Sequence, residues 1–178
     1  MQNEKISIAT TADIPYIVKL VNSAYRGEEA KQGWTHEADL IEGNMRIDES
    51  SLRELIEKTG SVILKNNDGE DLTGCVYLEK RGNSMYLGML SVSPWIQAKG
   101  IGKKLLGAAE KHALKNGCSK IEMTVISERA ELIAWYNRNG YHVTEEKKPF
   151  HSDSRFGVPR KNLEFIVMKK ILSDSKQT

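Results

Sequence analysis

The stretch that decides the fold is Val92-Ser93-Pro94-Trp95-Ile96-Gln97-Ala98-Lys99-Gly100-Ile101-Gly102-Lys103, where a predicted strand runs through a glycine-containing turn into a predicted helix. Glycines let the backbone approach a ligand closely. The first amides of a helix have no acceptor within it, and they lie at the positive end of the helix dipole. The junction therefore predicts a binding site for a phosphate group.

Two widespread phosphate-binding motifs do not fit this junction. The dinucleotide fingerprint Gly-x-Gly-x-x-Gly needs a third glycine where the chain has Leu105. The Walker loop needs four residues between its glycines and a lysine followed by Ser or Thr, but Lys103 is followed by Lys104. From the glycines alone, the alternative that Gly100 and Gly102 only make a tight turn stays open.

A wider pattern surrounds the two glycines. Val-x-Pro-x-x-Gln-x-x-Gly-x-Gly spans residues 92–102, and Trp135-Tyr136-Asn-Arg-Asn-Gly140-Tyr141 follows later in the chain. Together these motifs resemble those of the GCN5-related N-acetyltransferase (GNAT) superfamily, which has Gln/Arg-x-x-Gly-x-Gly/Ala and then an aromatic-Tyr pair, three residues, Gly and an aromatic. The resemblance implies an α/β fold with a mixed sheet, in the order β-α-α-β-β-β-α-β-α-β-β. It implies one domain over residues 1–178, with a core from about 6 to 170 and a short polar tail at 173–178.

Hydrophobic spacing predicts the same order of elements. The predicted strands are 6–9, 61–64, 72–79, 85–93, 120–126, 141–145 and 163–169, and the predicted helices are 14–25, 50–58, 101–116 and 129–138. Asn66-Asn67-Asp68-Gly69 predicts the turn of an antiparallel hairpin. The strand–helix–strand unit 85–126 predicts a parallel pair with a right-handed crossover. Residues 28–49 and the long connection 146–162 are expected to be loops, and loops of that length are often functional.

Composition limits the class of protein. The chain has 178 residues, 39% hydrophobic and 28% charged, as expected for one globular domain. The net charge of +2 conceals a difference between the halves: residues 1–89 carry ten Lys or Arg and fifteen Asp or Glu, whereas 90–178 carry sixteen and nine. The basic half suits a phosphorylated ligand. No arginine-rich arm or basic-aromatic motif indicates nucleic-acid binding.

Two further features concern the compartment. Cys75 and Cys118 lie far apart without metal-ligand spacing, so we expect reduced thiols and no metal. The N-terminus lacks the apolar stretch of a signal peptide, and no run approaches the ~18 apolar residues of a membrane span. We therefore expect a cytoplasmic protein that does not bind membranes. Exposed edge strands permit a homodimer but do not require one.

The family resemblance implies that acetyl-CoA is the acyl donor. Main-chain amides between Gln97 and Lys103 would hold its pyrophosphate, and the strand end at 90–92 would pair with pantetheine where it splays from the strand ending near Ile126. Arg129 stands where the family often has an asparagine that contacts pantetheine, and an arginine there suits a phosphate instead. The residues expected to contact coenzyme A are Leu90, Ser91, Val92, Gln97, Ala98, Lys99, Gly100, Ile101, Gly102, Lys103 and Arg129.

The implied reaction is direct attack of a primary amine on the thioester. A lysine-like amine of pKa ~10.4 is only about one part in 2,500 neutral at pH 7, a handicap of roughly 4–5 kcal/mol that a base or a shifted amine pKa must offset. The conceivable bases are Glu79, Glu122, His36 and Glu37, and the sequence does not choose among them. Tyr136 is the expected general acid for the departing thiolate by resemblance to the family. The alternative is that Tyr136 is a core aromatic.

The acceptor is the least determined part of the expectation. Tyr25, Trp34 and the acidic stretch to Glu57 are hypothesised to attract a cationic amine, because residues 28–57 carry nine acids and three bases. Residues of the last loop are hypothesised to wall the pocket: Phe150, Arg155 and Phe156. A small molecule and a peptide both remain open as acceptor. An alternative function is a non-catalytic acyl-CoA-binding regulator.

Overall fold

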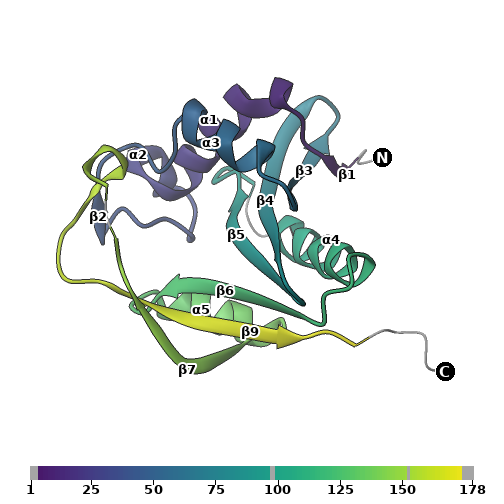
Figure 1. Ribbon diagram of the computed structural model, residues 1–178. Helices are drawn as coiled ribbons and strands as arrows, with labels where there is room; N and C mark the ends of the chain where they lie inside the picture. Colours follow the sequence, from purple (N-terminus) through teal and green to yellow (C-terminus); the bar gives the residue numbers. More distant parts are fainter. Residues whose placement is uncertain (1–3, 97–98, 152, 174–178) are drawn as a thin grey trace.

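The computed structural model describes residues 4–96, 99–151 and 153–173, and in them seven strands form one sheet in the order β1-β3-β4-β5-β6-β9-β7 (Figure 1). The strands are β1 (Glu4–Ile8), β3 (Ser61–Asp68), β4 (Asp71–Arg81), β5 (Ser84–Val92), β6 (Lys120–Ile126), β7 (His142–Pro149) and β9 (Glu164–Ile171). The helices are α1 (Ile14–Tyr25), α2 (Gly27–Ala30), α3 (Glu49–Glu57), α4 (Ile101–Lys115) and α5 (Ala130–Arg138).

Helices cover both faces of the sheet (Figure 1). Cys75 and Tyr77 of β4 pack in the same cluster as α1 and α3, whereas Val76 and Leu78 pack with α4. Successive strand residues point to opposite faces, so a strand that is covered on both faces has an uninterrupted apolar run. All four side chains are buried, which explains why this run forms a central strand.

The sequence predicted the helices closely. Those expected at 14–25, 50–58, 101–116 and 129–138 are α1, α3, α4 and α5, each within one residue of its expected bounds. The mixed α/β sheet and the parallel pairing of β5 with β6 are also confirmed. Of the polar tail expected at 173–178, all but the first residue lies outside the described residues. No helix in the described ranges has the length and apolar character needed to cross a bilayer.

The hairpin between β3 and β4 differs from the prediction. Its turn was expected at 66–69, but β3 continues to Asp68, which pairs with Asp71, so the loop consists of Gly69 and Glu70. Asn66 belongs to the ladder, where its side-chain amide donates to the Thr73 hydroxyl. Two-residue hairpin loops suit the twist of the flanking strands, and the Asn66 side chain has a partner inside the ladder.

Both long connections contain elements that the sequence did not predict. The first holds α2 and β2 (Ile41–Glu42), and the second holds β8 (Val158–Pro159), which pairs antiparallel with β2. The predicted element order therefore lacks α2, β2 and β8. Two-residue strands and a one-turn helix are too short to produce a hydrophobic period, so sequence periodicity cannot reveal them.

The strands β5 and β6 diverge, as expected. Their pairing covers only 84–86 against 120–122, although β5 continues to Val92 and β6 to Ile126. A register shift interrupts the β4–β5 pairing, and Met89 on β5 has a left-handed φ of 51°. An extra residue in one strand bends that strand. The bulge at Met89 therefore directs β5 away from β6 and opens a wedge between them (Figure 1).

Candidate functional site

The N-terminus of α4 lies beside the open end of this wedge. Gly100 caps the helix with φ 78° and ψ 10°, the left-handed conformation that glycine adopts without strain. The amide of Lys104 donates to the carbonyl of Gly100 at 3.0 Å. The amides of Ile101, Gly102 and Lys103 precede this first helical bond, so they have no acceptor in the helix. Three donors at the positive end of a helix dipole can bind an anion.

The second glycine of the junction has a packing role. A Cβ atom added at Gly102 would lie 3.3 Å from Cζ2 of Trp135 on α5, which is a tight contact. A Cβ atom added at Gly100 would meet no heavy atom within 4 Å. Gly100 is therefore required by its backbone conformation, and Gly102 by the close approach of the Trp135 indole.

A cleft of about 390 Å³ runs from this helix terminus along β5, and we call it the main cleft. The predicted site residues that line it are Leu90, Val92, Gly100, Ile101, Gly102, Lys103, Arg129 and Tyr136. Ser91 is also buried, but its hydroxyl donates to the Met89 carbonyl and it does not line the cleft. Lys99 is exposed outside the lining, and Gln97 and Ala98 lie outside the described residues.

Tyr136 is packed in the aromatic core and also borders the cleft, and its role as general acid stays a prediction. Its side chain is only 5% exposed, and its ring lies 5.1 Å from that of Trp135 and 5.8 Å from that of Tyr141. It also lines the main cleft. Burial raises the pKa of Tyr136 well above its ordinary value, so the phenol keeps its proton at neutral pH.

The two aromatic residues hypothesised for acceptor binding, Tyr25 and Trp34, both line the main cleft. Tyr25, at the end of α1, donates its hydroxyl to the carbonyl of Leu90 on β5. Trp34 lies 6.2 Å from Trp135 between ring centroids. Tyr25 therefore fixes the position of β5 beside the wedge, a role that a single sequence does not reveal.

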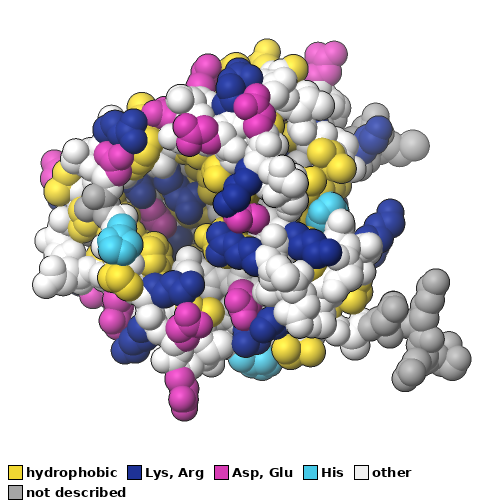
Figure 2. Space-filling model, viewed as in Figure 1, with side chains coloured by type: hydrophobic (Ala, Val, Ile, Leu, Met, Phe, Trp, Pro, Cys, Tyr) yellow, Lys and Arg dark blue, Asp and Glu magenta, His cyan; other side chains and the backbone are white. Residues whose placement is uncertain are grey.

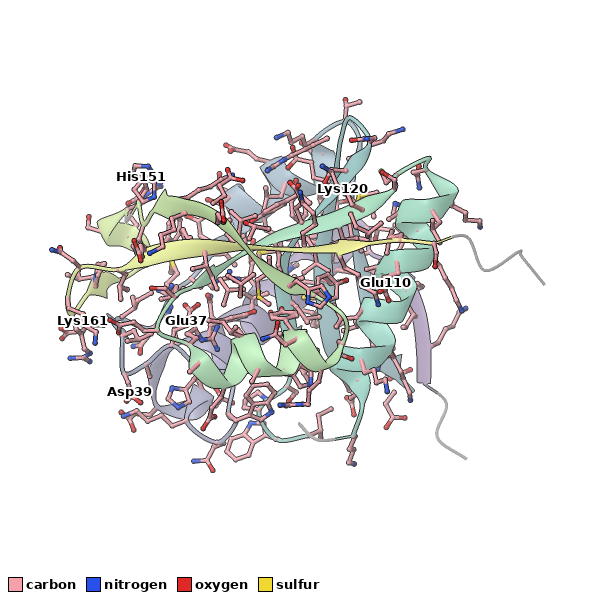
Figure 3. All side chains as sticks on the ribbon, turned by 90° about the horizontal axis from the view of Figure 1, so that it is seen from below. Glu37, Asp39, Glu110, Lys120, His151 and Lys161 are labelled. Atoms are coloured by element: carbon pink, nitrogen blue, oxygen red, sulfur yellow. The ribbon has the colours of Figure 1, made fainter. Side chains whose placement is uncertain are left out.

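A buried cluster of ion pairs lies beside the main cleft, which one of its members, Arg129, lines. Glu37 lies inside the fold, while Asp39 of the same segment is at the periphery (Figure 3). The Glu37 carboxylate contacts Nη1 of Arg129 at 3.4 Å and Nη2 of Arg26 at 3.1 Å. Arg26 also donates to the carbonyl of Phe156 in the last loop. This cluster joins α1, α5 and two long connections, so Arg129 both lines the cleft and stabilises its wall.

The structure separates the four candidate bases. Burial raises the pKa of Glu79, but hydrogen bonds from Lys58, Arg81 and Tyr77 outweigh this effect and bring its pKa to about 2. Burial likewise raises the pKa of Glu122, but its contacts with Lys120 and Lys169 have the larger effect, so the pKa of Glu122 is lowered overall. Neither residue lines the main cleft, whereas Glu37 borders the pocket described next. His36 lines a neighbouring surface cavity.

A smaller cavity of about 130 Å³ lies between the splayed strands, and we call it the inner pocket. It shares Tyr25, Leu90, Arg129, Leu132 and Tyr136 with the main cleft, so the two spaces adjoin each other. Its further polar and aromatic lining comes from Glu37, Arg46, Tyr86, Thr124 and Phe165. Figure 2 shows Lys and Arg side chains, with acidic ones beside them, in the hollow between the α1–α3 layer and β6.

The residues expected to wall the acceptor site lie slightly outside it. Phe150 packs against Phe165 with ring centroids 5.1 Å apart, so it supports the pocket wall from behind. Arg155 is exposed and pairs with Asp153. Phe156 contributes its carbonyl to the ion-pair cluster. No group of three or more metal-ligating side chains occurs in the described part of the chain.

Comparisons with known proteins agree with this arrangement. A model of the acetyltransferase (GNAT) family matches residues 19–141. The fold is similar to the ribosomal-protein-S18-alanine N-acetyltransferase of Escherichia coli, with TM-score 0.71, 15% identity and 98% of each chain covered. It is also similar to yncA of Salmonella typhimurium, solved with its cofactor acetyl-CoA, with TM-score 0.69, 21% identity, and 99% of this chain and 98% of that chain covered. The PaiA N-acetyltransferase of Thermoplasma acidophilum, in complex with coenzyme A, matches with TM-score 0.68, 19% identity, and 95% of this chain and 99% of that chain covered.

Proposed function

Because this chain belongs to the acetyltransferase (GNAT) family, we propose that it transfers an acetyl group from acetyl-CoA to a primary amine by direct attack. One observation carries the proposal: a helix N-terminus with three amides that have no acceptor within the helix, a splayed strand edge and a protonated tyrosine border the same cleft. These are the parts that a diphosphate, an amide-rich arm and a departing thiolate each require.

The coenzyme fits the cleft by two main-chain interactions. The diphosphate would accept hydrogen bonds from the amides of Ile101, Gly102 and Lys103, and the Lys103 side chain adds positive charge. Pantetheine contains amide groups that can pair with a strand edge as an added strand does. The edge from Leu90 to Val92, which extends beyond the pairing with β6, suits that role. Contacts of Lys99 and Arg129 with the coenzyme remain predictions.

The acetyl group then passes directly from sulfur to the amine nitrogen, without a covalent intermediate on the protein. The amine nitrogen forms a bond to the thioester carbon, the carbon–sulfur bond breaks, and the sulfur leaves as a thiolate. Tyr136 donates a hydrogen bond to the departing sulfur, and the proton that the amine loses reaches the thiolate through solvent. Because a phenol is a weaker acid than a thiol, Tyr136 acts by donating a hydrogen bond as charge develops on sulfur.

The proposal is tested by following the release of free thiol from acetyl-CoA with a panel of primary amines. Replacing Tyr136 with Phe keeps the ring packing and removes the donor. General acids contribute about 10²- to 10⁴-fold, and a thiolate already leaves readily, so we expect turnover to fall about 100-fold. Acetyl-CoA binding, measured by calorimetry, should stay unchanged.

Tyr141→Phe is the matched control. Tyr141 is fully buried in the same aromatic cluster, but it does not line the main cleft, and its hydroxyl has no partner among the described residues. Its removal should leave turnover unchanged. Equal turnover in the Tyr136→Phe variant and the wild type would remove the acid role. Tight acetyl-CoA binding without transfer to any amine would favour a non-catalytic acyl-CoA-binding regulator instead.

A further inference from the structure

Arg46 is a partly buried cation for which the proposed transfer has no use. Its guanidinium carbon lies 4.1 Å from the centroid of the Tyr25 ring, and the residue lines the inner pocket. Its Nη1 atom is shielded from solvent and has no hydrogen-bond partner among the described residues. A buried donor without an acceptor is costly, which makes this atom a candidate for contact with a ligand.

The surrounding charges do not neutralise Arg46. Among the described residues that line the inner pocket, Glu37 is the only carboxylate, and it already contacts Arg26 and Arg129. Arg46 forms no ion pair with it within 4 Å in the described structure. Three guanidinium groups therefore surround one carboxylate. Buried charges are stable when they are paired, so this wall lacks a negative partner.

We propose that the acceptor amine carries an anionic group, a carboxylate or an equivalent oxyanion, which pairs with Arg46. This inference rests on the proposed acetyl transfer. It replaces the expectation of a cationic acceptor, because the acidic stretch places only Glu37 on the wall of the inner pocket. A planar guanidinium binds a carboxylate through two parallel hydrogen bonds, which would hold the amine in a fixed orientation.

The position of Arg46 distinguishes this anion from the phosphates of the coenzyme. Arg46 lines the inner pocket but not the main cleft, whereas Ile101, Gly102 and Lys103 line the main cleft but not the inner pocket. The coenzyme phosphates and the acceptor anion would therefore occupy two adjoining but different spaces. Arg46 and the α4 terminus need not share one ligand group.

The size of the pocket limits the acceptor further. A volume of about 130 Å³ is close to that of a cavity that holds benzene, so the inner pocket admits the head group of an amino acid. A surface groove of about 300 Å³ shares Tyr86, Thr124 and Phe165 with it and continues towards His151. The structure therefore fits an α-amino acid whose side chain extends into the groove.

The test compares L-α-amino acids with the matching amino acid amides as acceptors in the free-thiol assay. The two members of each pair share the side chain and differ in the negative charge and in the basicity of the amine. The amide has the less basic amine, so chemistry alone favours the amide, and a preference for the acid reports recognition. We expect kcat/KM to be about 10- to 100-fold higher for the acids, as for a hydrogen bond between charged groups.

Variants connect the preference to Arg46. Arg46→Gln should abolish the preference for acids. Arg46→Lys keeps the positive charge but cannot form two parallel hydrogen bonds, so it should retain part of the preference. Arg53→Gln is the control, because Arg53 lies on the exposed side of α3 and pairs only with Glu57 in the described structure. It should keep the full preference. Melting temperatures and acetyl-CoA affinity of each variant show that the cleft is intact.

Each outcome is decisive. Equal or better use of amides or of a cationic amine such as spermidine by the wild type overturns the inference and leaves the proposed transfer standing. A preference for acids that survives in Arg46→Gln also overturns it. Failure of every acid as an acceptor counts against it as well. If the protein does not bind acetyl-CoA at all, the proposed acetyl transfer is wrong, and the inference about Arg46 fails with it.

Discussion

Gly100→Ala tests whether the left-handed cap of α4 builds the anion site. At φ 78° an alanine costs about 1–2 kcal/mol, of which about 0.4–1 kcal/mol is regained from the less flexible unfolded chain. The net loss of stability is about 1 kcal/mol, or about 2–4 °C in melting temperature for a chain of this size. No neighbouring atom lies within 4 Å of the added Cβ, so this loss comes from the backbone alone.

Gly107→Ala provides the matched control on the same helix. Its added Cβ also meets nothing within 4 Å, and its φ is helical, so alanine should stabilise α4 by about 1 kcal/mol. The two variants should therefore melt about 4–8 °C apart.

Calorimetry with coenzyme A then measures the functional part of the prediction. If Gly100→Ala turns the first amides away from the cleft, the loss of one hydrogen bond to a charged group raises Kd about 10- to 100-fold, whereas Gly107→Ala keeps the wild-type Kd. Equal stability and equal Kd in the two variants would refute the role of the cap.

Two further predictions concern residues whose contacts are visible. Glu79→Gln should lower stability by about 1–2 kcal/mol at pH 7, since its partners Lys58 and Arg81 are half-exposed. The Glu79 pKa falls from 4.5 to about 2 on folding, so urea unfolding should show the full deficit above pH 4.5 and a vanishing one near pH 2, with turnover at pH 7 unchanged. Tyr25→Phe removes the donor to the Leu90 carbonyl and should cost about 1–2 kcal/mol in the same unfolding assay. A loss below about 0.5 kcal/mol would contradict that contact.

Local sequence signals were sufficient for the long elements and for the glycine-capped N-terminus of α4. The glycine at the N-terminus of α4, the apolar period of the helix and the glycine after it occur within one continuous stretch, so each could be recognised without tertiary information. The same holds for the buried run at 75–78 of β4. These features depend on backbone conformation and on burial, which sequence patterns report directly.

The inner pocket could not be predicted for a physical reason. Arg46 approaches Tyr25, and Glu37 contacts Arg129, only because the segment 26–47 folds over the wedge. The charge sum of this segment suggested a negative site, but its carboxylates are mostly exposed while Arg46 lies on the pocket wall. The sign of a pocket depends on which side chains face it, and a charge count along the chain does not contain that information.

The most direct test is a crystal structure with coenzyme A bound. The account predicts diphosphate oxygens within hydrogen-bond distance of the amide nitrogens of Ile101, Gly102 and Lys103, with pantetheine beside the part of β5 that extends beyond its pairing with β6. A diphosphate bound at another surface, such as the groove near Lys148 and His151, with the α4 terminus facing only solvent, would contradict it.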